Sequence, residues 1–176
     1  MRAPIALLLV AGLFGCAHEP PPAAPAAQAA FVPPPPMPPQ DRAPICARPQ
    51  EKQAVAVSAL MSQLQVISIL CHTEDKYNTL VPRLRPALAI NIKALNGFFS
   101  RAYGKSAEKR RDDYITELAN MQSQLGLKSG DQFCALNAGV LDEVMALSDG
   151  DQLVVYASTK PIQQALAVSD CGTASR

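Results

Sequence analysis

The sequence predicts an all-α fold: an up-down four-helix bundle with one or two short C-terminal helices, cross-linked by two disulfides, behind a disordered proline-rich tether. Apolar residues recur every three or four positions in four long stretches, and no stretch of any length alternates as a strand does. Four cysteines lie within or beside these stretches. We expect the bundle domain over residues 49–172 and a disordered tail over 173–176.

The first sixteen residues have the pattern of an export signal. Arg2 supplies a positive start, and residues 3–13 form an apolar run. This run is too short to cross a bilayer as a permanent helix, which needs about 20 apolar residues. The residues that follow, Leu13-Phe14-Gly15-Cys16, resemble the lipobox of bacterial lipoproteins, with Phe14 in place of the usual small residue. The alternative is an ordinary signal peptide beside an unrelated cysteine.

The lipobox resemblance implies that residues 1–15 are removed and that Cys16 becomes the lipid-carrying N-terminus. Each buried methylene contributes about 0.8 kcal/mol, so two or three acyl chains would anchor the protein firmly. The residue after the cysteine is Ala17 rather than Asp, which by the same resemblance implies the outer membrane. The domain would then face the periplasm or the cell surface.

Residues 16–48 are expected to form a tether rich in proline and alanine, including the runs Pro20-Pro21-Pro22 and Pro33-Pro34-Pro35-Pro36. Such a segment favours an extended polyproline-II-like spacer without a core. At about 3.1 Å per residue, thirty residues reach roughly 90 Å. The alternative is a PxxP ligand for a partner or for the cell wall.

Helix boundaries follow from caps and breakers. The four predicted helices span Pro49 to Cys71, Asp75 or Thr79 to Tyr103, Ser106 to Gly126, and Ser129 or Asp131 to about Leu147. Pro86 predicts a kink or a late start in the second helix, and Gly104 its end. After Gly150 we expect two short helices, the second from Thr159 to Val168, with residues 153–156 as an alternative short strand.

The cysteines test the bundle topology. With Cys16 assigned to lipid, an even number remains, which favours disulfides in an exported protein. In an up-down bundle, the end of the first helix and the start of the fourth lie together, which predicts Cys71–Cys134. The opposite end brings Cys46 near Cys171. Each bridge closes a long loop and contributes about 4 kcal/mol in the chain-entropy model.

The sequence offers little for catalysis or metal binding. It has no CxxC, phosphate loop, dinucleotide fingerprint or nucleophile elbow, and His72 is the domain's one histidine. Paired carboxylates such as Asp112-Asp113 are adjacent on a helix and therefore diverge. We expect that the protein is not an enzyme and that it binds neither a cofactor nor a metal ion. Loss of Arg2 leaves 15 basic residues against 15 acidic ones, so the mature chain has no electrostatic footprint for nucleic acid.

One helix start breaks a local rule, because cations oppose the positive end of a helix dipole and anions are favoured there. The cations around the start of the third helix predict an anion-binding site: Arg101, Lys105, Lys109, Arg110 and Arg111. The alternative is a solvated face with a Lys109–Asp113 pair. Asn91 and Arg111 lie in helix seams, where they either pair across the interior or mark where a seam widens to solvent.

Several strings, Leu70-Cys71-His72, Tyr77-Asn78, Phe98-Phe99-Ser100-Arg101-Ala102-Tyr103-Gly104 and Phe133-Cys134, resemble an uncharacterised group of exported, four-cysteine helical proteins of Gram-negative bacteria. This resemblance implies the fold and export but no activity. We expect a non-catalytic envelope lipoprotein that binds another envelope component, a protein or a glycan. One alternative is a pilotin-like assembly factor for a secretin, favoured by an apolar groove beside Pro86. The other is a lipid or ligand carrier, favoured by an enclosed apolar pocket.

Overall fold

The computed structural model describes residues 44–171. The predicted signal, Cys16, most of the tether and the tail therefore lie outside the described residues. By its contacts the chain divides into Met1–Gln40 and Asp41–Arg176, and all described residues belong to the second unit. This unit is mostly helical, and its elements are β1 (Ile45–Ala47), α1 (Pro49–Leu70), α2 (Glu74–Tyr103), the 3₁₀ turn η1 (Gly104–Ser106), α3 (Ala107–Ser129), α4 (Asp131–Met145), α5 (Gly150–Thr159) and β2 (Val168–Asp170).

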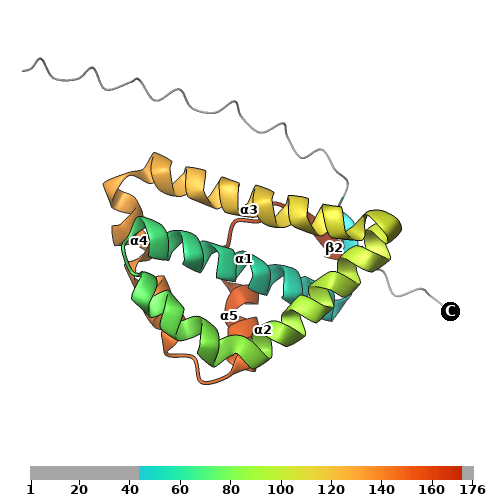
Figure 1. Ribbon diagram of the computed structural model, residues 1–176, viewed down its shortest axis with the longest axis horizontal. Coiled ribbons are helices and arrows are strands. Elements are labelled where there is room, and N and C mark those ends of the chain that lie inside the picture. The colour runs from blue at the N-terminus through green and yellow to red at the C-terminus, as the bar shows by residue number, and fades with distance from the viewer. Residues whose placement is uncertain (1–43, 172–176) are drawn as a thin grey trace, which may run out of the picture. The chain divides into compact units, whose positions relative to one another are not determined.

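The α1 helix is the centre of the domain, and it contacts all four of the other α-helices (Figure 1). Ala54, Ala59, Leu60 and Leu64 are completely buried. By length and composition α1 could cross a membrane, but half of its most apolar window is buried inside the domain, as is typical of a core helix. Its apolar character is explained by packing on several sides.

Two large apolar clusters and a smaller one at Val66, Ile67 and Phe133 divide the core of the described domain along α1. One large cluster joins the C-terminal half of α2 to α3 and contains Phe98, Phe99, Tyr114 and Leu118. The other large cluster joins α1 to the N-terminal half of α2, α4 and α5, and its largest buried members are Leu60, Leu64, Leu80, Leu84, Leu141, Val144 and Leu153. Each large cluster draws on residues that the helical periodicity places on one seam.

The α2 helix is continuous from Glu74, although it contains Pro82 and Pro86. Figure 1 shows that it bends partway along its length. Pro86 has no N–H to donate to the carbonyl of Pro82, and its ring crowds that carbonyl, which is the usual cause of a sharp bend. Of the two predicted outcomes at Pro86, the structure therefore has the kink.

Two glycines with positive φ end helices. Gly104, at φ 54°, follows α2 as predicted. The predicted end of the third helix at Gly126 is wrong, because α3 continues to Ser129 and Gly130, at φ 51°, ends it. Gly126 instead allows close packing: a Cβ there would overlap Cδ1 of Leu70 and lie 3.3 Å from the Phe133 ring.

The C-terminal segment differs most from the prediction. Residues 153–156 belong to α5, but the expected final helix from Thr159 to Val168 is absent from the described chain. Lys160 is extended, and the chain continues without a helix to β2, which pairs in parallel with β1 in the register Ile45↔Val168. Ala165 and Leu166 are buried in the core on the way. Burial and strand pairing override the local helix-start signal.

The disulfides are Cys46–Cys171 and Cys71–Cys134, the same two pairs that the topology predicts. The first joins the middle residue of β1 to the residue that follows β2, and the second joins the residue after α1 to the first turn of α4. We call β1, β2 and the Cys46–Cys171 bridge the clasp. It ties the first described residues to the last.

Candidate functional site

Arg101, the first of the predicted anion-binding cations, is paired with a buried carboxylate, Glu51, although Arg101 itself is exposed. Its Nε donates to Glu51 Oε1 at 2.9 Å, and its Nη2 donates both to Glu51 Oε2 and to the carbonyl oxygen of Cys46, the latter at 2.7 Å. Glu51 is only 8% exposed and also accepts from the backbone N–H of Arg48 at 2.8 Å. The pKa of the Glu51 carboxyl is lowered, chiefly by the Arg101 hydrogen bonds. Arg101 therefore anchors α2 to the start of α1.

The remaining four cations do not face one ligand position. Lys109 pairs with Asp113 at 2.8 Å, as the alternative predicts, and the Arg110 guanidinium lies 5.6 Å from the centre of the Tyr103 ring. Arg111 donates to Asn96 Oδ1 at 3.0 Å and to Asp112 at 2.9 Å. Lys105 is exposed in η1. The anion site stays a prediction, and the structure shows neighbouring side chains that compete for its charges.

Asn91 and Arg111 do not pair with each other. Asn91 donates to the carbonyl of Ala87, one helical turn earlier, at 2.9 Å. His72 is exposed in the turn after α1, where its φ is 55°. Within residues 44–171 no three His, Cys, Asp or Glu side chains gather in a way that could hold a metal ion.

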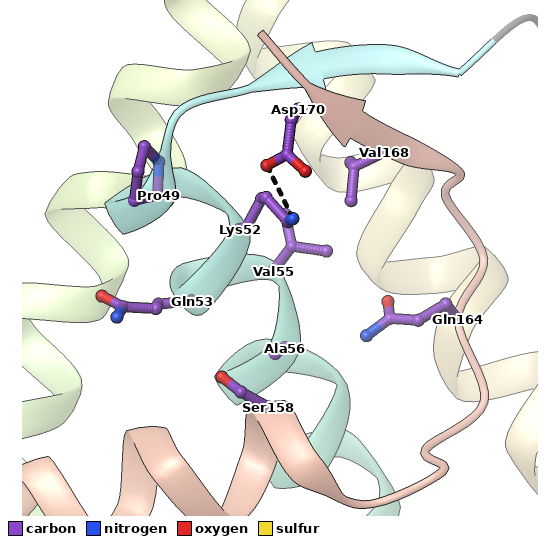
Figure 2. Close-up of a pocket in the computed structure, with 9 residues that line it drawn as sticks. All are labelled: Pro49, Lys52, Gln53, Val55, Ala56, Ser158, Gln164, Val168 and Asp170. Carbon is purple, nitrogen blue, oxygen red and sulfur yellow. Dashed lines mark hydrogen bonds and ion pairs between the residues drawn. The ribbon is translucent and has the colours of Figure 1, made fainter.

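A groove of about 380 Å³ lies beside the clasp, and we call it the clasp groove. It is lined by Pro49, Lys52, Gln53, Val55, Ala56, Ser158, Gln164, Val168 and Asp170. Figure 2 shows Asp170 of β2 meeting Lys52 of α1 across its upper end, with Nζ and Oδ1 2.8 Å apart, and Gln164 pointing toward α1. Sequence reasoning missed this groove because it missed β2, which contributes Val168 and Asp170 to the lining.

A second groove, of about 170 Å³, lies between α1 and α2 beside the bend of α2, and we call it the bend groove. Its lining is mostly apolar: Val57, Ser58, Met61, Tyr77, Val81, Leu88, Asn91 and Ile92. Ile92 is 58% exposed, and Ile90, two residues before it, is 71% exposed. Unlike most of the apolar side chains of the seams, these two face solvent.

The polar groups of the bend groove are neutral. Burial raises the pKa of the Tyr77 phenol, because the phenolate would lose its hydration. Asn91 already uses one N–H on Ala87. The lining of the groove is therefore apolar or neutral, and none of its residues carries a formal charge. In the sequence, the features that could have indicated this groove are Pro86, which bends α2, and the isoleucines Ile90 and Ile92, which lie outside the apolar seam.

Two further clefts lie between α1 and residues 160–163, with volumes of about 230 and 220 Å³. Both are open and share the amide side chains of Gln63 and Asn137, so they differ from the enclosed apolar pocket expected of a carrier. At the rim, Lys160 Nζ and the Tyr156 hydroxyl each donate to Glu143 Oε2 at 2.8 Å. These hydrogen bonds, that of Lys160 first, lower the pKa of the Glu143 carboxyl.

Comparison with known proteins adds no family to this geometry. No protein-family model, no curated protein and no solved structure matches the chain.

Proposed function

We propose that this chain is a non-catalytic lipoprotein of the bacterial envelope, anchored in the outer membrane through Cys16, whose helical domain binds another envelope component. The bend groove is the observation that carries the proposal. A neutral chain without convergent catalytic side chains in its described part is better suited to binding than to chemistry. The proline-rich tether would give the domain reach from the membrane.

The proposal includes the arrangement of α1 to α4 as an up-down bundle, with α5 packed beside it. The connections between successive helices of this set are one to three residues long, which favours neighbours that reverse direction. The two disulfides lie near opposite ends of α1, because Cys71 follows its last residue and Cys46 lies three residues before its first, which supports this arrangement.

A protein partner fits the bend groove better than a glycan does. Val57, Met61, Val81 and Leu88 offer apolar walls, and Ile92 adds an exposed apolar rim. Contiguous exposed apolar surface marks interaction sites, and an amphipathic helix inserts apolar residues into such a groove. A glycan would need several hydrogen-bonding side chains, which this lining does not offer in number.

The bend groove can be tested in cells with a photo-cross-linking residue at Met61 of the full-length lipoprotein. We expect a specific protein adduct that Ile92→Asp reduces at least tenfold, because a charge in the apolar rim would have to be desolvated on binding. Val155→Asp is the matched control, since Val155 is 62% exposed on α5, away from the groove. Equal loss in both variants, or in neither, would argue against the groove.

A pilotin-like assembly factor is the second candidate, and the apolar groove beside Pro86 is the feature that favours it. Such lipoproteins hold a helical segment of a secretin subunit. Deletion of this chain should then leave a secretin in the inner membrane. The Val155→Asp variant should restore its localisation and Ile92→Asp should not. Normal secretin localisation after deletion would exclude this candidate and leave the broader proposal intact.

Lipid anchoring has a separate test. Metabolic labelling with palmitate should mark the wild-type protein and leave Cys16→Ala unlabelled and released from the membrane fraction. Ala17→Asp should keep the label and shift the protein to the inner membrane, as the lipobox resemblance implies. A labelled Cys16→Ala protein would refute the anchor.

A further inference from the structure

The two disulfides lie in different surroundings. Cys71 and Cys134 pack against the cluster formed by Val66, Ile67 and Phe133, and Sγ of Cys134 lies 3.7 Å from the carbonyl oxygen of Leu70. Cys46 is exposed, whereas the other three cysteines, Cys171, Cys71 and Cys134, are half-buried. The clasp bridge is therefore the one with an exposed cysteine, and the apolar cluster at Phe133 packs against the other bridge only.

A guanidinium also faces one of the clasp sulfurs. Arg101 Nη1 lies 3.9 Å from Cys46 Sγ. Its Nε and Nη2 donate to the Glu51 carboxylate, so Nη1, which faces the sulfur, is not engaged by that carboxylate. A nearby arginine stabilises a thiolate, whereas the carbonyl oxygen beside Cys134 opposes one. Of the four cysteine sulfurs, Cys46 Sγ is the one beside a guanidinium that can stabilise a negative charge on it.

We propose that the Cys46–Cys171 bridge is a site of thiol–disulfide exchange with a dithiol, in which Cys171 is attacked and Cys46 leaves as the thiolate. The incoming thiolate bonds to Cys171 Sγ, the Cys46–Cys171 bond breaks, and its electron pair stays on Cys46 Sγ beside Arg101. The second thiolate of the dithiol then attacks the first sulfur of the same dithiol, which is bonded to Cys171 in the mixed disulfide. This step frees Cys171 and oxidises the dithiol to a disulfide, and both cysteines take up protons from solvent.

Opening this bridge would loosen the clasp and leave the helices joined. Without the bridge, β1 and β2 are held by a three-residue parallel pairing and the 2.8 Å Lys52–Asp170 ion pair. The burial of Ala47 and the hydrogen bond from Arg101 Nη2 to the carbonyl oxygen of Cys46 also hold β1. Strands this short are marginal by themselves. The Cys71–Cys134 bridge, at the other end of α1, still joins α1 to α4. The exchange site therefore controls how the tethered end of the chain is fixed to the domain.

The first test follows both bridges in the lipidated, full-length protein, where Cys16 is blocked. The protein is exposed to limiting dithiothreitol, quenched with N-ethylmaleimide, and mapped by mass spectrometry. We expect Cys46–Cys171 to open at least tenfold faster than Cys71–Cys134. Reduced glutathione should give a mixed disulfide mainly on Cys171. Equal opening rates, faster opening of Cys71–Cys134, or an adduct mainly on Cys46 would overturn the proposal.

The second test separates thiolate stabilisation from simple support of the clasp. If Arg101 stabilises the leaving thiolate, Arg101→Met slows exchange at Cys46–Cys171 at least threefold, because a less stable thiolate leaves more slowly. If Arg101 only supports the structure, the same variant loosens the clasp and accelerates exchange. Arg101→Lys, which keeps the cation, should stay closer to the wild-type rate than Arg101→Met. Arg110→Met is the matched control, because its guanidinium lies over Tyr103.

The opening rate of Cys71–Cys134 in each variant reports whether the rest of the domain has changed. Should Arg101→Met fail to fold, the position of the glutathione adduct in the wild-type protein still decides the direction of attack. Acceleration in Arg101→Met with an unchanged Cys71–Cys134 rate would refute the role of Arg101.

Discussion

Arg101 shows how a residue's role depends on a partner distant in sequence. Its position near a helix start, among other cations, predicts a ligand for an anion. In the folded chain its partner is Glu51, fifty residues earlier, together with the carbonyl of Cys46. A buried carboxylate with two donors on one guanidinium is a strong, charge-assisted contact. The local cluster of cations does not reveal the role of Arg101. That role follows from the positions of β1 and α1, which supply its two partners.

The Glu51–Arg101 pair predicts a loss of stability in acid. The pKa of Glu51 is lowered in the folded protein from an ordinary value of 4.5, first by the Arg101 hydrogen bonds. Its contribution is therefore complete above about pH 4.5 and is lost as the pH falls through the lower folded value. Glu51→Gln should reduce the free energy of unfolding by about 2 kcal/mol at pH 7 and by less at pH 3.

Urea unfolding followed by circular dichroism at both pH values checks this prediction. Glu108→Gln, an exposed carboxylate on α3, is the matched control and should change the free energy of unfolding by less than about 0.5 kcal/mol. An equal effect of Glu51→Gln at pH 7 and pH 3 would show that the charge of Glu51 is not the cause.

At the scale of elements, two helical glycines have opposite roles. Gly97 lies inside α2, and a Cβ added there would meet nothing within 4 Å. Gly150 begins α5, and a Cβ there would lie 2.5 Å from Cβ of Ala87 in α2. Because Ala87 has no flexible side chain to move, the close approach of α5 to α2 depends on this glycine.

We therefore expect Gly97→Ala to raise the free energy of unfolding by about 0.5–1 kcal/mol, because alanine loses less conformational entropy in a helix. Gly150→Ala should lower it by about 1–3 kcal/mol through overpacking. Thermal and urea unfolding of the two variants gives the comparison directly. Stabilisation by Gly150→Ala would mean that α5 can move away from α2 at no cost.

At the scale of the whole molecule, the two disulfides close long loops in a domain of modest size. Their sequence separations are 63 residues for Cys71–Cys134 and 125 residues for Cys46–Cys171. In the chain-entropy model these loops contribute about 4 and about 5 kcal/mol to stability, because each restricts the unfolded chain. The Cys46–Cys171 bridge is the covalent link between β1 and the residue after β2.

The double variant Cys71→Ala/Cys134→Ala should lower the free energy of unfolding by about 4 kcal/mol. Cys46→Ala/Cys171→Ala is its counterpart and should lose a similar or slightly larger amount. Both are measured by urea unfolding without reductant, so that the remaining bridge stays closed. A loss below about 1 kcal/mol in both variants would show that the unfolded chain is not the main target of the bridges.

The sequence by itself determined the four long helices and the cysteine pairs. Periodic apolar residues have one low-energy arrangement, an amphipathic helix packed on its seam, so the positions of α1 to α4 follow from local pattern to within a few residues. The kink at Pro86 and the end at Gly104 also follow from the chemistry of single residues. Cys71–Cys134 and Cys46–Cys171 follow once the helices are placed in order.

Only the tertiary structure decided the contacts that join distant segments. The strands β1 and β2 have three residues each, too few for a periodic signal, and they form because the fold brings residues 45–47 and 168–170 together. The same reason explains Gly126, which packs against Leu70 and Phe133 where a local reading expects a helix end. The contacts of Arg101 with Glu51 and Cys46, and the clasp groove, likewise form only between segments that are distant in sequence. Local propensity predicts where the helices lie. Packing against segments far along the chain decides which of their side chains are buried, paired or exposed.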